Sequence, residues 1–538
     1  MNRSIGIPYG QQHTAIIHRD GKPQRHPRQY SGRAAGSSPP PTPTSADRAL
    51  RSRHSPRGED RSSRIESIPP LTKGSVSSTY LYVKMEGGTD VFSVEKARLT
   101  VFEAAINEDH EYKASSAGVV CCFAVRCADT EDGLVITVDH DNKKPEHAYT
   151  RVESTQQSRS SSSSSESEFI LYAQADHWRQ FFSAIPKRPF QSYWGMLRLL
   201  GTEANVKVDG DLTAFTTHAH LWRLILDKIR YGMHPPRKEG IALTDYAPDD
   251  ERDDDSIRGH YTWLGLSSSM PIGKCKIFYE VSGRGEQQVL FLHTAGADSR
   301  QFHSMMMSKD LQQSCTMYAF DLPGHGRSFP GTEQYPLSYA NSEDFYIAVI
   351  GQFIAKLDLK NVIVSGASMG GQVCLAVALR AKELYVGGVI PCEACDYLPK
   401  QQAQSIYGLA GDESVLNPER VCGMISPTSP EVYKRLNWWI YSSQAARIFP
   451  GDLKFYFEGW DGRDRMKKID TQVCPVYMLT GEYDYSCSVD ASRATAAKIK
   501  GAVFEEMNGL GHFPFSEDPE MFLPYFKRAL EHIWQARR

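Results

Sequence analysis

The second half of the chain alternates short apolar runs with longer stretches that carry a helical pattern. The apolar runs are rich in β-branched residues and bounded by turn residues, which predicts buried strands. They lie at 289–292, 316–320, 361–365, 386–390, 473–481 and 502–507. Strands that alternate with helices predict an α/β domain, in which helices cover both faces of a mostly parallel sheet. We place this domain at residues 257–538.

The region before it, residues 76–235, has a different order of patterns. Apolar and polar residues alternate at 80–84 and 133–138, and a longer apolar strand is predicted at 119–125. Later patterns predict helices at 176–182, 192–200 and 212–231, with a short strand at 206–211. Strands that come first and helices that come later predict a separate α+β domain.

Three further segments have compositions that do not favour a packed core. Residues 1–75 are basic and rich in Pro, Ser and Arg but poor in large apolar residues, which predicts a disordered tail. The serine-rich stretch 154–167 predicts a loop insertion in the α+β domain. Residues 236–256, with the acidic run 249–255, predict an extended charged linker. Calcium binding at this run is disfavoured, because no glycine-spaced ligand loop is present.

Composition narrows the classes of function and location. The chain has 538 residues and a formal net charge of −3, so no nucleic-acid-binding footprint is expected. No run approaches the ~20 apolar residues of a membrane span, and no continuous apolar signal-peptide region is present. We therefore expect a cytoplasmic protein, with mitochondrial import through the Arg- and Ser-rich tail as the alternative. The sequence does not define an oligomeric state.

The spacing of cysteine and histidine residues does not predict a metal site. The 11 cysteines indicate reduced, mostly buried thiols. Cys392 and Cys395 have the C-x-x-C spacing without a second pair, so buried or loop thiols are favoured over a redox or zinc role. His218 and His220 lie two residues apart in a predicted helix and therefore point to different faces. We expect no metal and no organic cofactor.

One pentapeptide carries most of the chemical information: Gly366-Ala367-Ser368-Met369-Gly370. It fits the pattern G-x-S-x-G and lies between a predicted buried strand and a predicted helix. In that context the serine occupies a strained turn that lifts its hydroxyl clear of the sheet, at the positive end of the helix. Ser368 is therefore the predicted nucleophile.

A nucleophilic serine requires a base and an acid that orients the base. Asp484 follows one predicted strand, and His512 lies in the loop after the next. The three residues therefore follow the order Ser, acid, His. Glu482 and Asp490 are alternative acids, and the alternative for His512 is a solvent-exposed loop residue.

Acyl transfer at a serine also requires backbone N–H groups that stabilise the oxyanion. The amide of Met369, the residue after the nucleophile, is one predicted donor. The second is predicted in the loop after the strand at 289–292, at Ala295. His293 and Thr294 in the same loop are predicted to contact the substrate.

Residues 257–538 resemble the α/β-hydrolase superfamily, in the branch with a serine nucleophile and a lid. The matching motifs are His293-Thr294-Ala295-Gly296, Asp321-Leu322-Pro323-Gly324-His325-Gly326-Arg327-Ser328, Gly366-Ala367-Ser368-Met369-Gly370-Gly371, Gly481-Glu482-Tyr483-Asp484 and Gly511-His512. The resemblance implies acyl-transfer chemistry, and it places Asp321 and His325 in a turn at the rim of the site. The family often has His-Gly where this chain has His293-Thr294, which bears on the oxyanion geometry.

The resemblance also implies a lid, which we place at residues 395–468. This segment is rich in aromatic residues, which predicts an apolar pocket that excludes water. Trp438 and Trp439 are the predicted substrate contacts within it. Asp298 and Arg300, just after the oxyanion loop, have two open interpretations: contact with a polar substrate, or a helix cap.

The α+β region resembles, in the order of its elements, the sterol-carrier-protein-2 (SCP2-like) lipid-binding domain. The resemblance lies in the strand at 206–211 that leads into a last helix. It implies an apolar tunnel for a fatty-acyl or sterol-like ligand. An accessory domain that stabilises the hydrolase or mediates dimerisation is the alternative.

The sequence thus predicts a serine hydrolase that cleaves an apolar ester, thioester or lactone through an acyl-enzyme. The predicted partner is a small apolar acyl substrate. One alternative is a lipid-binding or transfer protein whose hydrolase fold does not turn over. Another is a hydrolase that cleaves a C–C bond in a diketone with the same serine.

Overall fold

The computed structural model describes Phe92 and residues 96–234, 257–400 and 411–537, apart from short gaps at 131, 142–143, 156–166, 267–271 and 335–337. The predicted tail at 1–75 and the predicted linker at 236–256 lie outside the described residues, as does most of the serine-rich stretch. We refer below to residues 96–234 as the N-terminal part and to residues 257–537 as the C-terminal part.

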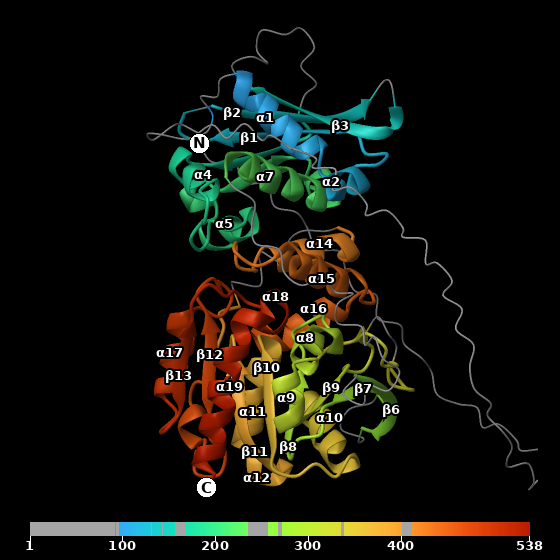
Figure 1. Ribbon diagram of the computed structural model, residues 1–538, viewed down its shortest axis with the longest axis vertical. Coiled ribbons are helices and arrows are strands. Elements are labelled where there is room, and N and C mark those ends of the chain that lie inside the picture. Colours follow the sequence, from blue (N-terminus) through green and yellow to red (C-terminus); the bar gives the residue numbers. More distant parts are fainter. Residues whose placement is uncertain are drawn as a thin grey trace, which may run out of the picture. The chain divides into compact units, whose positions relative to one another are not determined.

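The C-terminal part is built on an eight-stranded sheet with the order β13-β12-β11-β10-β8-β9-β7-β6 (Figure 1). The strands from β13 to β9 are parallel to their neighbours, and β7 pairs antiparallel with both β9 and β6. Their bounds are β6 (Arg258–Gly265), β7 (Lys274–Ser282), β8 (Gln287–Leu292), β9 (Cys315–Phe320), β10 (Val362–Ala367), β11 (Val386–Cys392), β12 (Tyr477–Gly481) and β13 (Val503–Met507). The predicted α/β class is confirmed for this part of the chain.

Helices cover both faces of this sheet, and the residues of β8 show why. Leu290 and Leu292 pack into one core together with α10 and α11, whereas Val289 and Phe291 pack into the other with α8 and α19. All four side chains are fully buried, and burial of such a side chain stabilises the fold by about 1.5–3 kcal/mol. The helices are η3 (Ser299–Phe302), α8 (His303–Met306), α9 (Lys309–Ser314), α10 (Glu343–Lys356), α11 (Met369–Leu379), α12 (Ala381–Leu384), α17 (Val489–Ala497), α18 (Pro514–Glu517) and α19 (Pro519–Ala536).

A helical insertion separates β11 from β12, where the lid is predicted. It contains α14 (Glu413–Cys422), α15 (Glu431–Ser442), α16 (Ile448–Lys454), η5 (Phe455–Gly459) and η6 (Met466–Lys468). Many of its large side chains belong to the same core as α10 and α11. The insertion therefore packs onto the sheet domain at the end of β11.

The order of the parallel strands creates a crevice. The chain passes from β8 to β9 on one side and then returns to place β10 on the other side of β8. In open α/β sheets, ligands bind outside the carboxyl ends of the strands at such a reversal. The loops after β8 and β10 therefore meet where a site is expected.

The N-terminal part has its own five-stranded sheet with the order β3-β2-β1-β4-β5. The strands are β1 (Cys121–Cys127), β2 (Gly133–Asp141), β3 (Lys144–Ser154), β4 (Phe169–Ala173) and β5 (Lys207–Gly210). The helices are α1 (Lys96–Asn107), α2 (His110–Ser115), α4 (Ala175–Phe181), α5 (Tyr193–Leu199), α6 (Leu212–Thr217) and α7 (Ala219–Met233), with a short η1 (Thr202–Ala204). In Figure 1, α1 and α7 lie together with β1–β3. Two helices, α1 and α2, precede the first described strand, and the predicted strand at 80–84 lies outside the described residues.

Aromatic rings fill the interior of the N-terminal part. Trp178 stacks on Tyr193 with the ring centroids 5.4 Å apart, and Phe215 stacks on Trp222 at 5.2 Å. All four side chains are fully buried in one core between the sheet and the helices. These rings belong to the packed interior of this part, and lipid binding by it stays a prediction.

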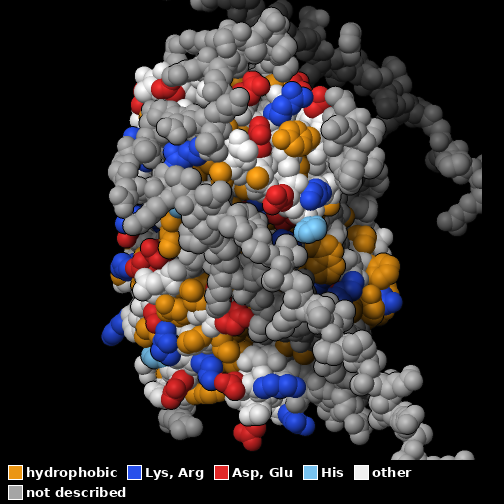
Figure 2. All heavy atoms as spheres, turned by 45° about the horizontal axis from the view of Figure 1, so that its top comes forward, with side chains coloured by type: hydrophobic (Ala, Val, Ile, Leu, Met, Phe, Trp, Pro, Cys, Tyr) orange, Lys and Arg blue, Asp and Glu red, His pale blue; other side chains and the backbone are white. Residues whose placement is uncertain are grey.

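The surface of the described residues mixes charges. Figure 2 shows Lys and Arg side chains interspersed with Asp and Glu side chains, and hydrophobic groups lie between them. No described helix is long and apolar enough to cross a membrane.

Candidate active site

Ser368 occupies the turn between β10 and α11 with a left-handed backbone, at φ +58°. The turn is tight because β10 lies against β8. A Cβ atom on Gly366 or Gly370 would lie 2.4 or 2.3 Å from the carbonyl oxygen of Leu292. A non-glycine residue in such a conformation costs on the order of 1–3 kcal/mol and persists where the surroundings enforce it. The strain predicted for Ser368 is therefore present, at the N-terminus of α11.

Asp484 and His512, on the loops after β12 and β13, lie in contact. Asp484 Oδ2 is 2.8 Å from His512 Nδ1. The other carboxylate oxygen accepts hydrogen bonds from the backbone N–H groups of Ser486, at 2.6 Å, and Cys487, at 3.1 Å. Both Asp484 and His512 are buried. A carboxylate at Nδ1 fixes the ring so that Nε2 is available to a serine.

The two alternative acids lie elsewhere. Glu482 accepts a hydrogen bond of 3.0 Å from the backbone N–H of Gly509 in an exposed contact. Asp490 lies in the first turn of α17. Of the three carboxylates that the sequence left open, Asp484 is the one that contacts the imidazole.

Two buried glutamates form hydrogen bonds with the backbone near these loops. The sequence analysis did not single out either residue. Glu517 accepts hydrogen bonds from the backbone N–H groups of Gly511 and Phe513, on either side of His512. Burial raises the pKa of Glu517 to about 8, against the opposing effect of these donors. Glu393 accepts from the N–H of Gly481 at 3.0 Å, and burial, followed by the charge of Asp484, raises its pKa. In the sequence, Glu517 could be found as a glutamate about one helical turn after the histidine loop. No comparable sequence signal marks Glu393.

Ser368 and His512 line one small cavity of about 30 Å³. Thr294 and Ala295, from the predicted oxyanion loop, line it as well. The remaining wall is mostly apolar or aromatic and consists of Arg198, Val421, Met424, Tyr441, Phe449, Leu453, Tyr456, Phe457, Ser486 and Phe513. A volume of this size holds about one water molecule.

His293 anchors the loop after β8 from inside the core. Its Nδ1–H donates to the carbonyl oxygen of Thr294 at 2.9 Å, and its Nε2 accepts from the N–H of Leu322 at 3.1 Å. Burial lowers the pKa of His293 to about 4, and the neighbouring His325 adds to the effect, so the ring is neutral. Both ring nitrogens bond to backbone, which gives His293 a structural role in place of the predicted substrate contact. Thr294 does line the cavity.

Asp452 of α16 ties the helical insertion to the same loop. Its Oδ2 accepts hydrogen bonds from the N–H of Gly296 at 2.9 Å and from His325 Nε2 at 2.8 Å. Its Oδ1 accepts from Tyr339 Oη at 2.7 Å and from Asn341 Nδ2 at 3.1 Å. Burial opposes ionisation of Asp452, but His325 and the other donors outweigh it, and the pKa of Asp452 lies below its ordinary value. His325 is thus structural, as the resemblance implied.

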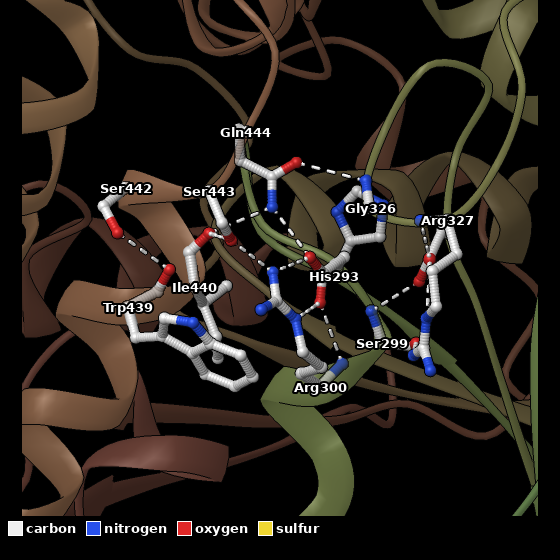
Figure 3. A network of polar contacts seen from close by, with 12 residues as sticks. His293, Ser299, Arg300, Gly326, Arg327, Trp439, Ile440, Ser442, Ser443 and Gln444 are labelled. Carbon is white, nitrogen blue, oxygen red and sulfur yellow. Dashed lines mark hydrogen bonds and ion pairs between the residues drawn. The ribbon is translucent and has the colours of Figure 1, made fainter.

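A second polar network joins the end of α15 to the rim (Figure 3). Asp298 caps η3 by accepting from the N–H of Arg300 at 3.0 Å, and it pairs with the Arg300 guanidinium at 2.6 Å. Arg300 also donates to Ser443 at 2.6 Å, and Gln444 donates to Asp298 at 2.7 Å. The cap interpretation of Asp298 is therefore the one that the structure supports. Neither residue is among those that line the cavity of Ser368 and His512.

Asp321 has a structural role beside this network. It accepts hydrogen bonds of 2.8 Å from the backbone N–H groups of Ser299 and Arg327, both of which Figure 3 labels. Burial, with the nearby Asp298 charge, raises the pKa of Asp321 to about 6. This carboxylate therefore shapes the rim of the site without lining the cavity.

Trp438 and Trp439 are not among the residues that line the cavity, and their contact with a substrate stays a prediction. Trp438 Nε1 donates to Glu419 at 2.7 Å, and Trp439 is half exposed with the Arg300 guanidinium 4.2 Å from its ring. The residue of α15 that lines the cavity is Tyr441, whose hydroxyl contacts that of Thr294. Successive helix positions point in different directions, so neighbouring aromatic residues cannot all face one site.

Within the residues that the structure describes, no group of three or more His, Cys, Asp or Glu side chains is placed to hold a metal ion. None of the 11 cysteines, all of which lie in the described part of the chain, forms a disulfide. The Sγ atoms of Cys395 and Cys487 lie 3.1 Å apart in the core beside the Asp484 loop. The C-x-x-C motif thus contributes one buried thiol to this contact.

Comparisons with known proteins point to one family. Residues 289–524, which include Ser368, Asp484 and His512, match the model of the alpha/beta hydrolase family. The chain is 23% identical to an uncharacterized hydrolase, YugF, of Bacillus subtilis, over 46% of this chain and 90% of the relative. It is also 23% identical to a putative esterase/lipase of Mycoplasma pneumoniae, over 46% of this chain and 91% of the relative.

Among solved structures, the chain resembles a thermophilic esterase from Thermogutta terrifontis. The TM-score is 0.44 at 18% identity, over 51% of this chain and 99% of the esterase. The family match agrees with the parallel sheet and with the strand–turn–helix around Ser368. Residues 289–524 of the chain are therefore similar to the alpha/beta hydrolase family.

Proposed function

We propose that the protein is a serine hydrolase that cleaves an apolar ester, thioester or lactone, with Ser368, His512 and Asp484 as its catalytic residues. The proposal rests on the spatial arrangement of these three residues. Ser368 and His512 line the same cavity, and Asp484 lies 2.8 Å from the far ring nitrogen of His512. Relatives named as a hydrolase and a putative esterase/lipase support hydrolytic chemistry.

The proposed reaction has two acyl-transfer steps. Ser368 Oγ attacks the carbonyl carbon while His512 takes its proton, and the leaving oxygen or sulfur then departs with that proton. Water attacks the acyl-enzyme, passes a proton through His512 to Ser368 Oγ, and releases the carboxylic acid. Asp484 stabilises the imidazolium ion in both steps.

The proposed oxyanion donors are the backbone N–H groups of Met369 and Ala295. Met369 is the first residue of α11, where the helix N-terminus favours negative charge. Ala295 lies in the loop that His293 and Asp452 hold in place. Donors fixed in this way need no reorganisation when charge develops, and loss of one such donor typically costs a factor of about 10²–10³ in kcat.

The walls of the cavity support an apolar substrate. Five wall residues contribute hydrocarbon surface: Val421, Phe449, Leu453, Phe457 and Phe513. The first four belong to the helical insertion. The cavity has room for about one water molecule, so we propose that this insertion moves when a substrate enters. We therefore propose that α14–α16 and η5 form a lid.

Covalent labelling with a fluorophosphonate tests the nucleophile. We expect Ser368→Ala to abolish labelling and the hydrolysis of p-nitrophenyl esters while the unfolding midpoint stays close to that of the wild type. Ser365→Ala is the matched control, because the Ser365 hydroxyl donates to the Ile390 carbonyl inside β10 and does not line the cavity. Labelling that persists in Ser368→Ala, or its absence from the wild type, would refute the proposal.

A further inference from the structure

The catalytic cavity has one wall residue from the N-terminal part of the chain. Arg198, on α5, lines the cavity together with Ser368 and His512. Its Nη2 donates to Ser486 Oγ at 3.2 Å, and its Nη1 lies 4.0 Å from Met424 Sδ. The guanidinium therefore reaches the loop that also carries Asp484.

Hydrogen bonds hold α5 in this position. Ser192 caps the helix by accepting from the N–H of Gly195 at 3.0 Å, and its hydroxyl donates to the carbonyl oxygen of Gly423 at 2.7 Å. Gln191 Nε2 donates to the carbonyl oxygen of Tyr483 at 2.9 Å. These contacts lie just before Arg198 in the chain, so they fix the position of the helix that carries its side chain.

The surroundings of Arg198 suit the recognition of an anion. Among the described residues that line the cavity, Arg198 is the only Lys, Arg, Asp or Glu. The rings of Phe457 and Tyr485 each lie 5.7 Å from the guanidinium carbon, at a distance where a cation is attracted to an aromatic face. A guanidinium against apolar walls binds oxyanions strongly, because its parallel N–H groups match two oxygens and water competes weakly.

We propose that Arg198 binds a carboxylate on the substrate, so that the enzyme acts on an acyl chain whose far end carries a negative charge. The inference rests on the proposed serine hydrolase and names its substrate class. One guanidinium balances the single charge of a carboxylate, whereas a phosphate monoester carries about −1.5 to −2 at neutral pH. The apolar walls would line the chain between the scissile bond and this group once the helical insertion has moved.

Arg198 has one competing role, which is to tie the N-terminal part to the Asp484 loop through Ser486. A purely structural contact affects all substrates alike, because it alters the shared catalytic residues. A substrate-binding contact affects only substrates with the matching charge, and it acts mainly on KM. The ratio of activities toward a charged and a neutral ester therefore separates the two roles.

The test uses the full-length protein and three p-nitrophenyl esters of matched length. These are mono-p-nitrophenyl suberate, its methyl ester, and an analogue that ends in a phosphonate. We expect the wild type to prefer the carboxylate ester. In Arg198→Gln, kcat/KM for that ester should fall about 10- to 100-fold, while the value for the methyl ester changes less than about threefold. Arg198→Lys should retain part of the preference, since it keeps the charge but loses the paired donors.

Arg179→Gln is the matched control, because Arg179 lies on α4 of the same part and is exposed. It should leave both esters unchanged. Equal losses on the charged and neutral esters in Arg198→Gln, or a wild type without a carboxylate preference, would overturn the inference. A stronger preference for the phosphonate would overturn the choice of carboxylate. In each of these cases, fluorophosphonate labelling that depends on Ser368 would leave the serine hydrolase standing; without such labelling, the proposed function itself fails.

Discussion

Arg188 Nη1 donates a hydrogen bond of 2.8 Å to the backbone carbonyl oxygen of Asp484. Arg188 belongs to the N-terminal part, and Asp484 is the carboxylate that contacts His512. The loop of the proposed catalytic acid is therefore held from two sides. Its own backbone N–H groups fix the side chain, and an arginine from a distant segment fixes the main chain.

We expect Arg188→Gln to lower kcat about 3- to 30-fold toward every ester. A hydrogen bond from a charged donor contributes about 1.5–3 kcal/mol, but part of the order survives because Ser486 and Cys487 still hold the carboxylate. Steady-state kinetics and the rate of fluorophosphonate labelling should fall together. Unchanged kinetics would show that the main chain at Asp484 needs no support from Arg188.

The assignment of the acid predicts a large effect at one carboxylate and small effects at its two neighbours. We expect Asp484→Asn to lower kcat on the order of 10⁴-fold, because an amide at His512 Nδ1 favours the wrong tautomer of the ring. Glu482→Gln and Asp490→Asn are the matched controls and should stay within about threefold of the wild type. Stopped assays over a long time course measure the residual rate, and a comparable loss in either control would move the role to that residue.

The tight turn at the proposed nucleophile predicts that Gly370 does not tolerate a larger residue. In Gly370→Ala, the new Cβ atom would lie 2.3 Å from the Leu292 carbonyl oxygen, so β8 or the turn must shift. We expect a loss of stability of about 1–3 kcal/mol, seen as a lower midpoint of thermal unfolding, together with slower labelling of Ser368. Gly265→Ala in β6 is the control, because a Cβ there meets no atom within 4 Å. Equal unfolding midpoints for the two variants would contradict the packing argument.

His293 predicts a defined pH dependence of stability. Its pKa is about 4 in the folded protein and about 6.5 in an unfolded chain, so the unfolded chain binds the proton more tightly. The contribution of the neutral ring is therefore complete above pH 6.5 and is lost as the pH falls from 6.5 to 4, by roughly 3 kcal/mol in all.

We expect the difference in unfolding midpoint between the wild type and His293→Gln to shrink when the pH is lowered from 7.5 to 5. Glutamine does not titrate, so it lacks this loss. Thermal unfolding at the two pH values measures the difference. A difference that stays constant or grows at pH 5 would show that His293 is protonated in the folded protein.

The central strands of the C-terminal part were predictable because they are buried on both faces, whereas β6 and β7 at the edge of the sheet were not predicted. Every residue of β10 is buried, and such a strand appears in the sequence as a continuous apolar run. The edge strand β3 of the N-terminal part was missed, because Lys144–Ser154 is largely polar and shows no clear alternation. The predicted helix at 212–231 is divided into α6 and α7. Thr216 Oγ1 bonds to the carbonyl oxygens of Leu212 and Thr213, a pattern that bends helices.

In the candidate site, some residues could be predicted from the nearby sequence, whereas others depend on segments that are distant in the chain. Ser368, Asp484 and His512 each follow a strand closely, so sequence order was enough to propose them. The direction in which an aromatic side chain points depends on how its helix packs, and the sequence pattern did not define this direction for Trp438. Arg198 lies far from Ser368 in the chain, and only tertiary packing brings the two to one cavity.

The close approach of α5 to the Asp484 loop limits how independently the sequences of these two segments can change in evolution. A Cβ atom on Gly195 would lie 3.0 Å from the ring of Tyr485 and 2.6 Å from the carbonyl oxygen of Pro189. The two surfaces must therefore change in concert, and a larger side chain on one requires room on the other. A chimaera that joins the C-terminal part to the N-terminal part of a diverged relative should regain the proposed activity only when α5 and residues 483–486 come from the same parent.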